Sequence, residues 1–534
     1  MARAPRSWYS ISAWARRDSI ELAEVPCHML PTTVRVTRQG FFKSLRLNPR
    51  WTAWVRPQRV FVIFAIVFGL SLAALTAPFQ APDEPQHFLR AYQISEGGIF
   101  PTYLQDRGGG ELPASLTEVS RRFASLRFTY RAKTSPDKIR EASRIALKPH
   151  IRQFTPFVTA IYSPVAYIPQ ATTFWIGRQF DMPPLELMYL GRIANLFAWI
   201  TFGYAALRLV PTCGRPLLLL LLMPMSLFQA ASLSADATTN GLAVLFAAMV
   251  LRGIVGLRAG RESPRDASAE PRPGPMGLVT WWAALAIVTA ALSLTKFAYF
   301  PLLAFLLLIP SARAGGTKNY VLALVAIALV NLAVLLAWGS QSHGLNTVLR
   351  DEPDVSARRQ VQYLRSHPSA LITVPASTVA RDGWRVVRSF VGRLGSMDTP
   401  MSVYFILGYL AAIVVACWLQ DDRPPLPPRA ILAALILIPT LISAACISLL
   451  NYIYWAPVGS RFIEGMQGRY FLPFAPAMVI LIWALTRKLA SHPWARIAER
   501  KLNLAVAIVA LIGCSYTVIA VYLRYYSLHS LARP

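Results

Sequence analysis

The chain has 534 residues, of which 54% are hydrophobic and only 15% are charged. A soluble chain of this length would form several domains with more charged surface, so the composition excludes ordinary soluble domains and predicts a polytopic membrane protein. The net charge of +28 is spread over loops between hydrophobic runs. We therefore expect it to set membrane topology, and we expect no nucleic-acid partner.

The first 58 residues form a basic arm, which we expect on the cytoplasmic side. The arm is rich in arginine and has no apolar stretch long enough for the core of a signal peptide. The first hydrophobic run, at about 60–78, is therefore expected to insert uncleaved as an anchor. Alternatively, the sequence is extended at its amino end, and Met29 is the natural first residue.

The hydrophobic pattern predicts an all-α polytopic fold with about eleven membrane-spanning helices, because about twenty apolar residues cross a bilayer. With this set of spans the short basic loops all fall on the cytoplasmic side, as the positive-inside rule requires. The predicted spans are 60–78, 186–208, 216–233, 238–251, 277–295, 297–312, 319–338, 401–420, 429–450, 470–486 and 504–523.

One apolar stretch, 157–176, is interrupted by prolines and polar residues. We expect it to be re-entrant or interfacial, since a true span there would invert the sidedness of every later loop.

The expected domain organisation follows from these spans. A polytopic domain covers 59–490, and 491–534 holds the last spanning helix with a short tail. Loops at about 80–155 and 340–400 are expected to be partly helical and to lie outside the cytoplasm. The linker 252–275, rich in Pro and Arg, is expected to be a flexible cytoplasmic loop.

The first polar group of interest is the segment 81–90, directly after the first helix. Asp83 and Glu84 are adjacent between two prolines, and His87 and Arg90 follow at helical spacing. These residues could simply start a helix, with an N-cap and acids near its amino end. Alternatively, Asp83 or Glu84 is a general base, or the two acids with His87 hold a divalent cation such as Mg or Mn.

Two cations near apolar helices form the second group. Lys296 interrupts a long apolar stretch, where it either snorkels at a helix break or holds a lipid phosphate. Arg469 follows Glu464 and Gln467 in the glycine-containing segment 461–473. Arginine clamps a phosphate more rigidly than lysine does, whereas interfacial anchoring is the alternative for this segment.

Tyr162, Arg192 and Asp236 lie on the same predicted side and complete the set of substrate-binding candidates, although such residues more often serve packing or capping. The chain shows no phosphate loop, GxGxxG, HExxH or nucleophile elbow. Nucleotide-driven transport, dinucleotide chemistry, zinc proteolysis and esterase chemistry therefore lack their usual signatures.

The segment 82–97, which reads PDEPQHFLRAYQISEG, resembles a family of bacterial polytopic membrane proteins known only as a domain of unknown function. That family typically carries PDE-x-x-H-F-x-R-A after its first helix. The resemblance covers roughly residues 59–490. It continues at 162–169, 232–240, 296–301, 394–399 and 467–473.

The architecture of that family is similar to the GT-C glycosyltransferases, which use polyprenyl-phosphate sugars and place an essential acid in the first outside loop. This resemblance implies that Asp83 deprotonates an acceptor hydroxyl and that Glu84 or His87 orients the acceptor or binds a cation. Lys296 and Arg469 would hold the departing lipid phosphate, and one direct displacement would invert the anomeric centre.

The implied partners are a polyprenyl-phosphate-linked sugar, an envelope glycan or glycolipid acceptor, and membrane lipids, with the chain multi-pass in the bacterial cytoplasmic (inner) membrane. A transporter or flippase of a lipid-linked saccharide is the main alternative, although it would favour charges near mid-bilayer and related halves. A non-catalytic envelope-assembly protein is the other.

Overall fold

The computed structural model describes residues 55–255, 277–341, 343–420, 426–486 and 499–527. All of them belong to one compact unit, residues 52–534. The basic arm up to residue 54, with the alternative start Met29, and nearly all of the linker 252–275 lie outside the described residues.

Helical structure coincides with every predicted span, and the all-α polytopic fold is confirmed. Seven of the described helices are long and apolar enough to cross a membrane by length and composition. The elements at the predicted spans are α3 (Pro57–Leu75), α8 (Pro184–Leu209), α9 (Gly214–Leu221) with α10 (Pro224–Ala230), α11 (Ala235–Val255), α12 (Leu278–Thr295), η5 (Phe297–Leu308), α13 (Thr317–Gly339), α16 (Val403–Trp418), α17 (Arg429–Trp455), η8 (Gly468–Phe474) with α18 (Ala475–Thr486), and α19 (Glu499–Tyr526).

Three predicted spans depart from a regular α-helix, and each contains a proline at the irregular part. The span at 470–486 begins as the 3₁₀-helix η8, with Pro473 inside it, before α18 starts. The span at 216–233 is divided into α9 and α10, because Pro224 begins the second helix and cannot donate to the turn before it. The span at 297–312 is a 3₁₀-helix, η5, with Pro301 inside it. A proline within a helix removes one backbone hydrogen bond and crowds the preceding turn.

The stretch 157–176 forms no spanning helix. It folds into two short 3₁₀ turns, η2 (Val158–Ile161) and η3 (Pro164–Tyr167), and one short helix, α7 (Ile168–Arg178). About twenty residues are needed to span a bilayer, so α7 is too short to do so.

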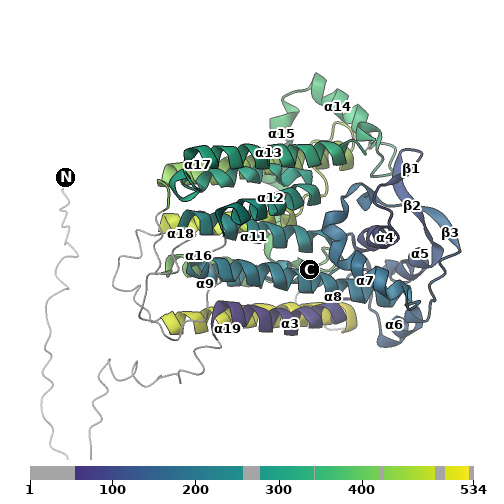
Figure 1. Cartoon of the computed structure of the whole chain (residues 1–534). Coiled ribbons are helices and arrows are strands. Elements are labelled where there is room, and N and C mark those ends of the chain that lie inside the picture. Colours follow the sequence, from purple (N-terminus) through teal and green to yellow (C-terminus); the bar gives the residue numbers. More distant parts are fainter. Residues whose placement is uncertain (1–54, 256–276, 342, 421–425, 487–498, 528–534) are drawn as a thin grey trace, which may run out of the picture. The chain divides into compact units, whose positions relative to one another are not determined.

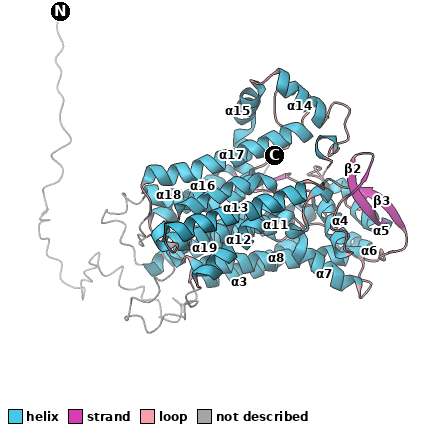
Figure 2. Ribbon diagram, turned by 45° about the horizontal axis from the view of Figure 1, so that its top comes forward, coloured by secondary structure: helices cyan, strands magenta, loops and turns pink. Residues whose placement is uncertain are grey.

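The spanning helices run side by side, and most of the connecting structure gathers at one end of them (Figure 1; Figure 2). We call this the loop end. Among the spanning helices, α11 is the most buried and α13 the least. The elements of the loop end are α4 (Glu84–Ser95), β1 (Thr102–Leu104), β2 (Arg107–Pro113), α5 (Ala114–Arg121), η1 (Ala124–Leu126), α6 (Pro136–Ser143), β3 (Arg152–Pro156), η7 (Gly344–Asn346), α14 (Ala357–Ser366), α15 (Ala370–Val391), β4 (Arg393–Leu394) and β5 (Thr399–Pro400). The short 3₁₀ turns η4 (Pro211–Cys213) and η6 (Ser311–Arg313) connect other helices.

The loop 80–155 contains a three-stranded antiparallel sheet, β1-β2-β3, which the expectation of helical loops did not include. Its middle strand holds three consecutive glycines. A Cβ on Gly109 would lie 2.3 Å from the backbone oxygen of Thr155, so the close approach of β2 and β3 requires glycine there.

The motif at 394–399 fastens the last helix to the loop end. Asp398, in the β4–β5 hairpin, pairs with Arg524 of α19 at 2.6 Å, and the Arg524 side chain is fully buried. Arg524 also donates to the backbone oxygens of Leu126 and Ala132. The carboxyl end of α19 therefore lies at the loop end, where the predicted alternation of helices places it.

Candidate functional site

Asp83 occupies the N-cap position of α4 but does not cap that helix. Its backbone is left-handed, with φ of 59°, and its side chain makes no capping hydrogen bond. The carboxylate instead accepts from the guanidinium of Arg469 at 2.5 Å. Such a conformation is uncommon and costly for a residue other than glycine, and it persists where the surroundings fix it. The side chain is thus directed away from the helix and toward other charges.

Four side chains form a connected group that we call the ion cluster: Asp83, Asp236, Lys296 and Arg469. Arg469 bridges both acids, at 2.5 Å to Asp83 and 3.2 Å to Asp236. Lys296 Nζ lies 2.5 Å from the other oxygen of Asp236. Two positive and two negative charges therefore balance within a chain of direct contacts.

The ion cluster assembles because each member stands where a helix begins or ends at the loop end. Asp236 lies in the first turn of α11, where the helix dipole favours a negative charge. Lys296 separates α12 from η5. Arg469 lies in the first turn of η8. The sequence predicted that these residues share one side of the membrane, and the structure brings them into contact.

The position of Arg469 depends on close packing against α15. A Cβ on Gly468 would lie 2.1 Å from the backbone oxygen of Val386 and 2.2 Å from the nitrogen of Phe390. The N–H of Gly468 donates to the hydroxyl of Ser389 at 2.7 Å. Only glycine allows this approach, so α15 fixes the backbone from which Arg469 extends.

All four members of the ion cluster line a cavity of about 420 Å³ at the loop end. The Asp83 side chain keeps 50% of its surface exposed, whereas Arg469 keeps 3%. Because Asp83 lines the cavity, this exposed surface faces a space within the protein. Tyrosine and tryptophan side chains form much of the remaining wall: Tyr162, Tyr299, Trp338, Tyr454, Trp455 and Tyr470.

Two opposing effects on the pKa of the Asp83 carboxyl set its protonation state. Burial raises the pKa of this carboxyl, but the charges of Arg469 and His87 lower it more, so the pKa lies below its ordinary value. Asp83 is therefore ionised at neutral pH and able to accept a proton.

His87 also lines the cavity, one helical turn after Asp83. Its Nδ1 shares a hydrogen bond of 2.7 Å with the hydroxyl of Tyr167. Burial lowers the pKa of His87 to about 4, against the opposing influence of the nearby acids. The ring is neutral near pH 7, and the bond at Nδ1 leaves Nε2 for a group in the cavity.

Glu84, the neighbour of Asp83, is engaged elsewhere. It forms a two-point ion pair with Arg192, at 2.8 and 2.7 Å, and both side chains are fully buried. Its oxygens also accept from the backbone N–H groups of Leu233 and Ala81. Burial raises the pKa of Glu84, but Arg192 and these N–H groups lower it more. The geometry thus gives Glu84 and Arg192 a structural task in joining α4, α8 and the end of α3.

The other sequence candidates divide between the cavity and the framework. Tyr162 lines the cavity, with its ring 6.0 Å from Lys296 Nζ. Gln467 accepts from Arg469 at 2.6 Å and so helps to orient it. Arg90 is fully buried and donates to backbone oxygens, including that of Tyr162. Glu464 pairs with Arg350 at 2.6 Å and does not line the cavity.

The hypothesis of a divalent cation at Asp83, Glu84 and His87 receives no geometric support. Within the described part of the chain, no group of three or more His, Cys, Asp or Glu side chains could hold a metal ion. Glu84 faces Arg192 instead. The cation requirement stays a prediction.

Sequence reasoning missed the wall that α13 and α17 contribute to the cavity. Leu335 and Trp338 come from α13, and Ile447 and Leu450 come from α17. Apolar residues in a spanning helix carry no signal that they face a cavity. Asn451, a polar residue near the end of α17 that also lines the cavity, is the signal that was available.

The comparisons with known proteins agree with this architecture. The chain matches the model of a family described as "Predicted membrane protein (DUF2142)" over residues 66–478, more than half of its length. No curated protein matches it.

Proposed function

The chain belongs to this family of membrane proteins of unknown function, and from its site we propose that it is a glycosyltransferase. It moves a sugar from a polyprenyl-phosphate donor to a cell-envelope glycan or glycolipid, on the outer side of the bacterial cytoplasmic membrane. The observation that carries the proposal is the ion cluster, which places an ionised carboxylate and two cations on the wall of one cavity beside membrane-spanning helices.

The class of donor follows from the chemistry of the cavity. Its walls combine apolar side chains of α13 and α17 with the cations Lys296 and Arg469. A ligand that satisfies both parts has an anionic group and an apolar portion. A lipid-linked phosphate has both, whereas a nucleotide sugar would place a polar base against apolar walls.

The proposed reaction is a single displacement with Asp83 as general base. The Asp83 carboxylate takes the proton of the acceptor hydroxyl, and the acceptor oxygen forms a bond to the anomeric carbon. The bond from that carbon to the phosphate oxygen breaks, and its electron pair leaves with the polyprenyl phosphate. Because the acceptor attacks opposite the leaving group, the anomeric configuration inverts.

Charge movement explains why the base and the cations are in contact. The donor phosphodiester carries one negative charge and Asp83 another. After transfer, Asp83 is protonated and the product phosphate carries two negative charges. The net charge in the cavity is unchanged, and Arg469, which touches Asp83, stays beside the place where the negative charge develops.

The remaining residues act through these groups. Described residues offer Lys296 Nζ one hydrogen-bond acceptor, Asp236, which leaves N–H donors for the phosphate. Asp236 positions both cations. Neutral His87 contacts the acceptor through Nε2. Glu84 is a positioning residue, because its pair with Arg192 fixes the start of α4 and hence the backbone of Asp83.

The test is sugar transfer by the purified full chain from a panel of radiolabelled polyprenyl-phosphate sugars to envelope glycolipid. The expected result is transfer from one donor with inversion, and loss of at least about 100-fold in rate in Asp83→Asn. Glu186→Gln, an exposed acid in the first turn of α8, is the matched control and keeps the wild-type rate. Transfer with retention, or no transfer from any donor, overturns the proposal.

A further inference from the structure

We propose that the lipid chain of the substrate lies between α13 and α17, in a side passage that joins the ion cluster to the bilayer. The side passage is the part of the cavity bounded by Leu335 and Trp338 of α13, Ile447 and Leu450 of α17, and Phe297 at the start of η5. The inference rests on the proposed function for the identity of the polar end of the ligand. It adds where the apolar end lies.

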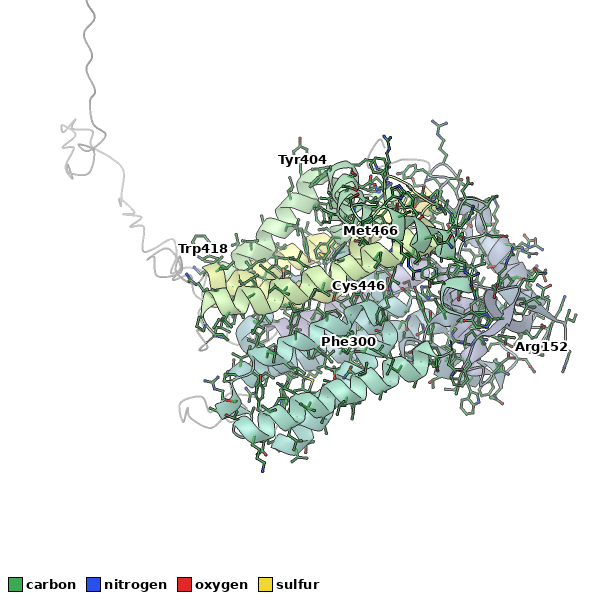
Figure 3. The ribbon with its side chains drawn as sticks, turned by 90° about the horizontal axis from the view of Figure 1, so that it is seen from above. Arg152, Phe300, Tyr404, Trp418, Cys446 and Met466 are labelled. Atoms are coloured by element: carbon green, nitrogen blue, oxygen red, sulfur yellow. The ribbon has the colours of Figure 1, made fainter. Side chains whose placement is uncertain are left out.

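The helices around η5 leave the side passage at the start of that helix. Along its length, η5 packs against both α12 and α17. Figure 3 shows α17, which carries Cys446, running beside η5, which carries Phe300. Toward the loop end, η5 begins at Phe297, and the cavity takes its place. Over their described residues, α13 and α17 do not pack extensively on each other.

The rim of the side passage is exposed as well as cavity-lining. Phe297 keeps 60% of its surface exposed and Leu450 keeps 37%. Both belong to helical segments whose outward faces are apolar and, in a membrane, meet lipid. A cavity residue with this much exposed apolar surface marks the place where the cavity meets the surrounding lipid.

Polar contacts hold α13 against α12 rather than against α17. Asn331 of α13 is fully buried, accepts from the Ser293 hydroxyl at 2.7 Å and donates to the Thr289 hydroxyl at 3.1 Å. Hydrogen bonds between spanning helices are favourable in lipid, where polar groups have few other partners. These bonds fix one wall of the side passage, so α13 does not close the space by moving toward α17.

The order of groups along the side passage matches one class of ligand. Lys296 lies at the inner end and receives the phosphate, and the apolar pair Leu335 and Leu450 receives the chain segment that follows it. A polyisoprenoid chain that moves there from the bilayer exchanges one apolar environment for another, so burial from water contributes little to the preference. We therefore expect selectivity to come from the fit between the chain and the apolar walls.

The experiment measures binding without sugar transfer. Long-chain polyprenyl phosphate and its two-isoprene analogue, neither carrying a sugar, are titrated into the purified full chain in nanodiscs at matched mole fraction. Leu335→Trp and Leu450→Trp narrow the side passage. Leu336→Trp and Leu449→Trp are the matched controls. They place a tryptophan at adjacent, exposed positions of the same helices that do not line the cavity.

We expect the two passage variants to bind the long-chain ligand at least about tenfold more weakly than wild type, a loss of roughly 1.4 kcal/mol. Their affinity for the two-isoprene analogue changes less than about threefold. The control variants keep wild-type affinity for both ligands. Equal effects in passage and control variants, or equal losses for both chain lengths, overturn the side passage.

The outcome separates this inference from the proposed function. If long-chain phosphate binds through the side passage but no donor supports transfer, the glycosyltransferase proposal fails and the side passage stands. If transfer occurs and the passage variants keep the wild-type preference for long chains, the side passage fails and the transferase stands.

Discussion

Mutation of the two adjacent acids of the first loop is predicted to change fold stability by very different amounts, although the sequence presents the two acids as equivalent. Glu84→Ala removes a carboxylate that is fully buried and bonded to Arg192 at two points. Arg192 then carries a buried charge with no opposite charge beside it. Asp83→Asn removes a carboxylate that is half-exposed to the cavity. The first change is expected to destabilise the fold, and the second to leave it largely intact.

The magnitudes follow from burial. Removing one partner of a buried ion pair costs about 3–5 kcal/mol, because the remaining charge stays desolvated. Arg192 keeps the backbone oxygens of Ala73, Thr76 and Ala77, which places the expected cost of Glu84→Ala near about 3 kcal/mol. For Asp83→Asn we expect about 1 kcal/mol or less. Asparagine also tolerates the left-handed backbone of this position.

The assay is reversible unfolding in mixed micelles. Stability is compared through the fraction of denaturant in the micelles at which half of the protein is unfolded. A double-mutant cycle with Arg192→Met should return a coupling energy of at least about 1 kcal/mol for the Glu84 pair. A stable Glu84→Ala, together with an Asp83→Asn that unfolds readily, would refute the division of tasks between the two acids.

Four further predictions concern the site and the helices that surround it. Gly468→Ala forces α15 and the Arg469 segment apart, because its Cβ would lie 2.1 Å from the Val386 oxygen. Limited proteolysis should then cut α15 faster than in wild type. Unchanged protection of α15 would contradict its close packing against Gly468. Asn331→Leu should cost about 0.6–2 kcal/mol in mixed-micelle unfolding through lost bonds between α12 and α13; no change would mean those bonds contribute nothing. The pKa of His87 is lowered to about 4 in the folded protein, so the unfolded chain binds more protons between about pH 4 and 6.5. Stability should therefore rise with pH in that window. His87→Gln should flatten this part of the plot of Tm against pH, and an unaltered slope would assign the rise to other groups. Since the pKa of Asp83 is also lowered, transfer should be flat from pH 5 to 8, and a decline centred near pH 6.5 would mean that a histidine controls it.

The order of the spans and the side on which each loop lies were predictable, because the length of an apolar run and the charge of the adjoining loop are local properties of each segment. The helix ends that carry Asp83, Asp236, Lys296 and Arg469 meet at the loop end, as the predicted topology required. Which segments are regular was less accessible. Pro224 and Pro301 break or tighten helices whose composition alone predicts a continuous span.

The tasks of neighbouring polar residues were not predictable from the sequence. Asp83 precedes α4 with a left-handed backbone, whereas Glu84 is the first residue of that helix, so their side chains face different surroundings. Only the fold decides which one meets the cavity. The same holds for Arg90 and Arg192, which the sequence placed with substrate-binding candidates and which the structure shows bonded to backbone oxygens and to Glu84. The walls of the side passage are apolar positions in spanning helices and carry no sequence signal.

Single-turnover kinetics separate the chemical step from donor binding and so examine whether Asp83 is the base of a sugar transfer from a lipid phosphate. Wild type and Asp83→Asn are each loaded with the active donor, and acceptor is added in excess. We expect donor affinity in Asp83→Asn to stay within about threefold of wild type while the rate of the transfer step falls at least about 100-fold. Equal transfer rates in the two proteins, with the donor bound in both, would contradict that role of Asp83.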